Sequence, residues 1–153
     1  AVALPRPAFL NQGHIPTVCT RVQLAADACP RRSIYGQARA TSPLLDEPLV
    51  GPVYLRSSSN ELPDLVASLK GQVDIDLVGR IDSIRRGIRT TFEAGPDAPV
   101  STFVLTMQGG KKGLLQNSRN LCRAPSRATA KLTGHNGRQI VLRSPMRASC
   151  GKG

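Results

Sequence analysis

The side chains that could act as nucleophiles or bases are few and lie far apart in the sequence. There are two histidines, His14 in a stretch rich in Gly and Pro and His135 beside an Asn-Gly pair. A hydrolytic triad needs a histidine beside a serine and a carboxylate, but no GxSxG nucleophile elbow occurs. The serine run at residues 57–59 is typical of a polar loop. We therefore predict no catalytic residue, no enzymatic activity and no cofactor, with a hydrolase that uses His14 or His135 as the alternative.

Two further motifs invite a metal or phosphate interpretation. Asp74, Asp76 and Asp82 share one strand parity, but calcium needs roughly six to eight oxygens from a folded loop, and no DxDxDG motif occurs. The pattern predicts a solvated strand face with Arg80 as an ion-pair partner, and no metal site. The GGKKG sequence at residues 109–113 lacks the order and the Ser or Thr of a Walker loop, so it predicts a basic turn.

Four cysteines are present, and none of them forms a CxxC pair. An even number at wide spacing favours disulfides made in an oxidising compartment. Of the three pairings that four cysteines allow, Cys19–Cys29 with Cys122–Cys150 closes the shortest loops, and we predict this pairing. The alternative is four free thiols in a cytosolic protein.

The whole chain has a net charge of +11, and the excess positive charge is concentrated in its last third. Ten of the 21 Lys and Arg residues follow Asp97, the last carboxylate, and this asymmetry indicates an anionic partner, with plain solubility as the alternative. Nucleic acid is the less favoured polymer, because single-strand platforms use aromatic side chains and none follows Phe103. The predicted polyanion-binding residues are Lys111, Lys112, Arg119, Arg123, Arg127, Lys131, Arg138 and Arg143.

The elements that would position these residues are strands. From residue 71 to residue 84, apolar and charged side chains alternate with period 2, which predicts a strand with one buried face. Arg85-Arg86-Gly87 predicts a tight turn, with residues 88–94 as the returning strand. Asn136-Gly137 between two alternating runs is a strong hairpin signal. About eight short strands at roughly ten-residue spacing predict an all-β fold, an antiparallel β-sandwich.

The first 30 residues have a different character. Pro5, Pro7 and Pro16 predict an irregular N-terminal segment over residues 1–30, packed on a single β-sandwich domain over residues 31–153. One short helix is expected near residues 20–28, with a strand over residues 17–24 as the alternative. Pro52 predicts that the strand over residues 49–56 lies at an edge or contains a bulge. No segment approaches the ~20 apolar residues of a membrane helix, so we predict no membrane insertion.

Residues 29–133 contain the pieces CP at Cys29, SPLLDEPLVGPVYL, LPDLV, IRTTF, PDAPVSTF, GGKKGLL and the NLC that ends at Cys122. In these pieces the chain resembles a segment of large, uncharacterised secreted or surface proteins of actinobacteria. The resemblance covers about two-thirds of the chain, and it rests on the specific sequence of these pieces. It implies export and a β-rich fold, implies no activity, and allows this chain to be part of a longer protein.

Together these observations predict a secreted or cell-envelope module with a structural or binding role. It would present a basic surface to an anionic cell-envelope polymer or to a protein partner. One alternative is a nucleic-acid or other polyanion-binding protein. Another is a subunit of an extracellular fibre or shell, which would self-associate through edge strands such as residues 49–56.

Overall fold

The computed structural model describes residues 1–153 apart from residues 7, 85–86, 94, 125 and 151–153, and apart from the side chain of residue 112. The described residues form an all-β antiparallel fold with one short α-helix, which confirms the predicted class. The strands are β1 (Val2–Pro5), β2 (Ala8–Leu10), β3 (Ile34–Thr41), β4 (Leu49–Arg56), β5 (Asp64–Leu69), β6 (Ile75–Ile84), β7 (Gly87–Phe92), β8 (Thr102–Met107), β9 (Leu115–Asn117), β10 (Ser126–Thr133) and β11 (Gln139–Met146). The helical elements are α1 (Arg21–Ala25) and the 3-10 turns η1 (Gln12–His14), η2 (Arg31–Ser33) and η3 (Gly110–Lys112).

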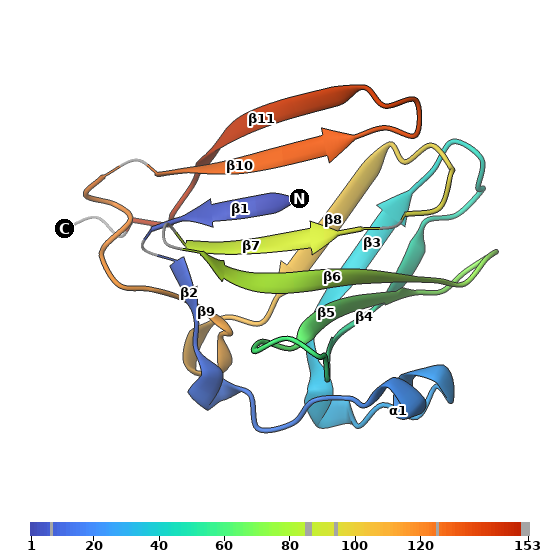
Figure 1. The fold of residues 1–153 in the computed structure, drawn as a ribbon, viewed down its shortest axis with the longest axis horizontal. Coiled ribbons are helices and arrows are strands. Elements are labelled where there is room, and N and C mark those ends of the chain that lie inside the picture. Colours follow the sequence, from blue (N-terminus) through green and yellow to red (C-terminus); the bar gives the residue numbers. More distant parts are fainter. Residues whose placement is uncertain (7, 85–86, 94, 125, 151–153) are drawn as a thin grey trace.

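Nine strands form one sheet in the order β11-β10-β1-β7-β6-β5-β4-β3-β8, and β2 pairs with β9 separately. Strands β3 to β7 follow one another as a meander, and β8 returns to the far side of β3. The sheet curls, so that β8 passes behind β6 and β7 in Figure 1. The rings of Phe92 on β7 and Phe103 on β8 meet edge to face at 6.4 Å. The two halves of the curled sheet thereby face each other as the layers of a sandwich.

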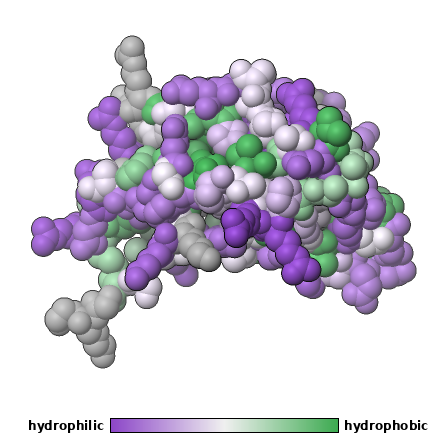
Figure 2. Space-filling view, turned by 90° about the horizontal axis from the view of Figure 1, so that it is seen from below, coloured by the Kyte–Doolittle hydropathy of each residue, from purple (hydrophilic) through white to green (hydrophobic). Residues whose placement is uncertain are grey.

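The core lies inside the curl and follows the period-2 alternation of the strands. Leu65, Ala67 and Leu69 of β5 point inward, and the cross-strand partners continue this face on β4 and β6. Further along the sheet the same face is open, because Leu132, Ile140 and Leu142 of the β10–β11 hairpin stay about half exposed. Figure 2, which views the molecule from below Figure 1, shows patches of hydrophobic side chains among hydrophilic ones on that face.

The predicted irregular segment over residues 1–30 contains two strands, so this prediction is wrong for residues 2–5 and 8–10. Val2–Pro5 is strand β1, which pairs with β7 on one side and with β10 on the other. Pro5 is tolerated because it is the last residue of the strand, where its missing N–H interrupts no further pairing. Ala8–Leu10 is strand β2, which pairs with Leu115–Asn117. The sheet therefore includes strands from both sides of Pro30, and its first strand is β1.

The short helix predicted near residues 20–28 is present as α1. Thr20 caps it, since its side chain accepts a hydrogen bond from Gln23 N while the Gln23 side chain accepts one from Thr20 N. Asp27, with a φ of 52°, turns the chain after the helix, before Pro30 is reached. On the other side of Thr20, Cys19 is fixed to β4, because Cys19 N donates to Leu55 O at 2.7 Å and Ser57 N donates to Cys19 O at 2.8 Å.

Pro52 predicts an edge strand or a bulge over residues 49–56. The edge is wrong, because β4 lies between β3 and β5, and the β3–β4 ladder contains a register shift between Ile34 and Gly36 on the β3 side. Pro52 is accommodated by an interruption of the β4–β5 ladder, which pairs from Val53 onward and again at the Val50–Lys70 bridge. Beside it, a Cβ on Gly51 would lie 1.7 Å from the Ser68 carbonyl oxygen, so only glycine permits this close approach. The free edges of the sheet are β8 and β11.

Two hairpin turns were predicted, and one of them lies entirely within the described residues. The Asn136-Gly137 turn is confirmed: it joins β10 to β11, and Gly137 has a φ of 76°. Of the turn between β6 and β7, Arg85 and Arg86 lie outside the described residues, and Gly87 has a φ of 131°.

Candidate functional site

The β10–β11 hairpin carries three of the predicted polyanion-binding residues on one face. Arg127 and Lys131 lie on β10, and Arg143 lies on β11 directly opposite Thr129. These positions share the parity that points away from the core, whereas Ala128 and Ala130 share the opposite one. Arg127, Lys131 and Arg143, called the basic face from here on, are all solvent-exposed.

The basic face lacks the internal neutralisation found elsewhere on the sheet. On β6, Asp82 lies 3.3 Å from both Arg80 and Arg89, which confirms the predicted Arg80 partner. On the part of the chain that the structure describes, the ion pairs of lysine and arginine side chains all involve residues before Asp97. The cations of the basic face have no carboxylate partner among the described side chains, so their field extends into solvent.

The other predicted residues do not join this face. Lys111 lies on η3, and the side chain of Lys112 is outside the described part. Arg119 and Arg123 lie in the loop between β9 and β10. Arg138 precedes β11 at the parity opposite to that of Arg143. Of the eight predicted residues, three lie together on one face of the β10–β11 hairpin.

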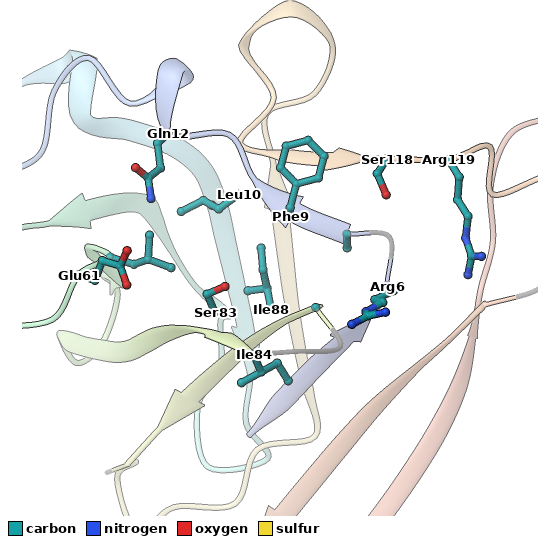
Figure 3. Close-up of a pocket in the computed structure, with 13 residues that line it drawn as sticks. Arg6, Phe9, Leu10, Gln12, Glu61, Ser83, Ile84, Ile88, Ser118 and Arg119 are labelled. Carbon is teal, nitrogen blue, oxygen red and sulfur yellow. The ribbon is translucent and has the colours of Figure 1, made fainter.

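Two adjoining cavities lie beside the basic face. The first, of about 530 Å³, has Arg6 and Arg119 on one side and Gln12 and Glu61 on the other, as Figure 3 shows. Its other lining residues include the apolar side chains Phe9, Leu10, Ile84 and Ile88. The second cavity, of about 590 Å³, shares Arg6 and Ile84 with the first and is also lined by Arg127 and Thr129. Sequence analysis did not identify Arg6, because the position of Arg6 depends on strand β1 and the prolines of this segment predict irregular structure.

Each of the two histidines lies near an oxygen atom of another residue of the chain. His14 Nδ1 lies 2.9 Å from the Gly113 carbonyl oxygen. His135 Nε2 lies 3.8 Å from Asp97 Oδ1, and both of these side chains are exposed. Neither histidine lines either of the two cavities. Within the described part of the chain, no three or more His, Cys, Asp or Glu residues gather as metal ligands would.

Shifted pKa values occur in the buried half of the sheet, away from the basic face. Burial raises the pKa of the Tyr35 hydroxyl, which donates a hydrogen bond to the Thr17 carbonyl oxygen at 2.9 Å. Burial also raises the pKa of Tyr54, with a further contribution from the carboxylate of Asp27. The Asp74 carboxylate, 3.2 Å away, raises the pKa of the exposed Lys70 ammonium.

Both predicted disulfides are present, Cys19–Cys29 and Cys122–Cys150. Their Cα–Cα distances of 5.3 and 5.9 Å are ordinary for disulfides. The alternative of four free thiols is thereby excluded. Two disulfides indicate that the chain folds in an oxidising compartment.

Comparisons with protein-family models, with curated proteins and with solved structures gave no match. The fold and the cysteines define the class of this protein as an all-β antiparallel domain with two disulfides. The resemblance to secreted actinobacterial proteins stays a prediction. Among the described residues, no helix has the length and apolarity needed to cross a membrane.

Proposed function

We propose that this chain is a secreted or cell-envelope binding module, without catalytic activity, whose basic face holds an anionic polymer. The observation that supports the proposal is the set of three exposed cations on one strand pair, with no carboxylate partner among the described side chains. A bound polymer would supply the missing anions. The disulfides support export, because they require an oxidising compartment.

The spacing of the basic face suits a repeating anion. Arg127 and Lys131 are four residues apart on β10, which is about 13 Å along a strand. Arginine can bind a phosphate, sulfate or carboxylate group in a bidentate manner, and lysine acts as a mobile point charge. No aromatic residue lies on β10 or β11, so the hairpin offers no platform on which nucleic-acid bases would stack. An anionic polymer of the cell envelope is therefore the preferred partner, and nucleic acid is the second.

The test is salt-dependent binding to heparin, to polyglutamate and to single-stranded DNA. The variant R127Q/K131Q/R143Q removes the basic face, and the control R21Q/R31Q/R32Q removes the same charge from exposed residues near α1 and η2. Each lost anion contact lowers the slope of log K against log salt by about one, so the first variant should lose a slope of about three. The control should keep the wild-type slope.

Three results would count against the proposal. Absence of binding at low ionic strength would exclude a polyanion partner. Equal losses in the two variants would show that net charge alone is responsible. Much tighter binding to single-stranded DNA than to heparin would favour the nucleic-acid alternative.

A further inference from the structure

The two free edges of the nine-stranded sheet differ in chemistry. Among the strands that the structure describes, β8 pairs only with β3 and β11 pairs only with β10. Residues 98–110, which contain β8, include no charged residue, in a chain whose net charge is +11. The six residues of β8 also include neither Pro nor Gly, and five of them are exposed. An exposed, uncharged edge strand of this kind is a template for pairing with another chain.

The hydrogen bonds of β3 show which groups of β8 are available. Gln108 N donates to Tyr35 O at 2.8 Å, in the register that continues the β3–β8 ladder. Bonded and non-bonded positions alternate in an antiparallel ladder. The backbone N–H and C=O groups of Phe103, Leu105 and Met107 therefore point away from β3, toward the free edge.

The same reasoning shows that the β11 edge is protected. Gly134 N donates to Arg138 O at 2.8 Å, so the alternation directs the backbone of Val141, Arg143 and Pro145 toward the free edge. Pro145 has no N–H to donate. The Arg143 carbonyl already accepts a hydrogen bond from Arg127 Nη1 at 3.4 Å. Proline and a cation on an edge strand both oppose pairing with another strand.

We propose that β8 is the edge through which two copies of this chain pair, antiparallel and about a two-fold axis at Leu105. A second copy is the occupant because this stretch is where two +11 chains can meet without opposing like charges. The strand is also self-complementary about Leu105, since Phe103 and Met107 lie at symmetric positions with apolar side chains. The inference is independent of what the basic face binds.

The alternation selects the register. Hydrogen-bonded pairs require outward-facing residues on both strands, so Leu105 lies opposite Leu105 of the second copy and Phe103 lies opposite Met107. The inward faces then form a row of aromatic–sulfur and Leu–Leu contacts that covers the half-exposed Phe103 and Leu105 side chains. On the outer face, Val104 lies opposite Thr106 of the second copy.

The first test uses proline at the two edges, with the oligomeric state of the oxidised full chain measured by light scattering after gel filtration. At about 100 µM the wild type should be a dimer. Leu105→Pro removes an N–H that faces the free edge and spares the β3 ladder, so it should give a monomer. The matched control Val141→Pro removes an edge-facing N–H from β11 and should remain a dimer, with circular dichroism to establish that both variants fold.

The second test fixes the register by charge. V104K/T106K places like charges opposite each other across the axis and should give a monomer. V104K/T106E has the same positions and similar polarity, but the introduced lysine faces the introduced glutamate of the second copy, so the dimer should persist. A monomeric wild type, a monomeric V141P, or equal behaviour of the two charged variants would overturn the proposal. So would an open polymer, because this would require β8 to pair with β11.

Discussion

Strands β5 and β11 belong to the same sheet but have opposite surroundings. All six residues of β5 are buried, whereas seven of the eight residues of β11 are exposed. Both strands contain apolar residues at alternate positions, so alternation by itself does not make a core. The residues of β5 are buried in the curled part of the sheet, and burial decreases toward β10 and β11.

This difference separates two roles within one sheet. The buried half, β3 to β6, contains Leu55, Val66 and Leu69, which have at most 1% of their surface exposed. The open half contains the basic face and one free edge. We expect substitutions in the buried half to change stability, and substitutions in the open half to change binding while stability stays nearly constant.

The largest expected contrast is between two leucines. Leu55→Ala removes a fully buried side chain and should lower the free energy of unfolding by about 4 kcal/mol. Leu142→Ala truncates a side chain that is 43% exposed and should cost less than about 1 kcal/mol. Urea unfolding followed by circular dichroism measures both. Equal losses would mean that the open half is covered in solution.

The disulfides give the next contrast. In the chain-entropy model each bond contributes about 3 kcal/mol. C19S/C29S should cost more than C122S/C150S, because Cys19 is fully buried and its replacement leaves a serine hydroxyl in the core. Thermal unfolding of the two double variants tests this order. A greater loss in C122S/C150S would place the stabilising crosslink in the open half.

Ion pairs should follow the same division. Arg56 Nη2 and Asp64 Oδ2 are 2.7 Å apart and largely buried, so Asp64→Ala leaves an unpaired guanidinium and should cost about 3 kcal/mol. The exposed Asp97, beside His135, is the matched control, and Asp97→Ala should cost less than about 0.5 kcal/mol. Denaturant midpoints measure both effects. Similar midpoints for the two variants would show that the buried Arg56–Asp64 pair stabilises the fold no more than the exposed contact of Asp97 does.

The smallest expected effect concerns alkaline pH. Burial raises the pKa of Tyr35, so the folded state holds this proton more tightly than the unfolded state does. The resulting stabilisation is complete below the unfolded pKa of about 10 and is lost as the pH rises through the folded value. Tyr35→Phe should cost about 1 kcal/mol at neutral pH through the lost bond to Thr17, and should weaken the loss of stability above about pH 10. Urea titrations at both pH values measure this, and an unchanged alkaline slope would assign the effect to Tyr54.

The features that could be predicted from sequence depend on near neighbours in the chain. Period-2 alternation in residues 75–84, the Asn136-Gly137 pair and the spacing of the four cysteines are local signals. Arg127, Lys131 and Arg143 were predicted from charge alone, within a set of eight basic residues, and the pairing of β10 with β11 places these three on one face. The two cavities did not follow, because Arg6 reaches them only through the pairing of β1 with β7 and β10.

The sequence pattern also did not predict which strands form the two free edges of the sheet. Pro52 suggested an edge at β4, whereas the glycine beside it lets β5 approach so closely that the strand is internal. The free edge at β8 depends on the return of the chain to β3 after β7. That choice is made by long-range packing such as the Phe92–Phe103 contact, which no local pattern records.

Strand β1 has a consequence for the order of folding. The meander from β3 to β7 forms by pairing successive strands, which is fast because the loops to be closed are short. Ala1 and Lys131, by contrast, exchange hydrogen bonds across 130 residues of sequence. Because β1 lies between β7 and β10, the β10–β11 hairpin reaches the meander only through β1. We expect the meander to form first and the β10–β11 hairpin to dock only when β1 inserts, so the slow step of folding completes the basic face.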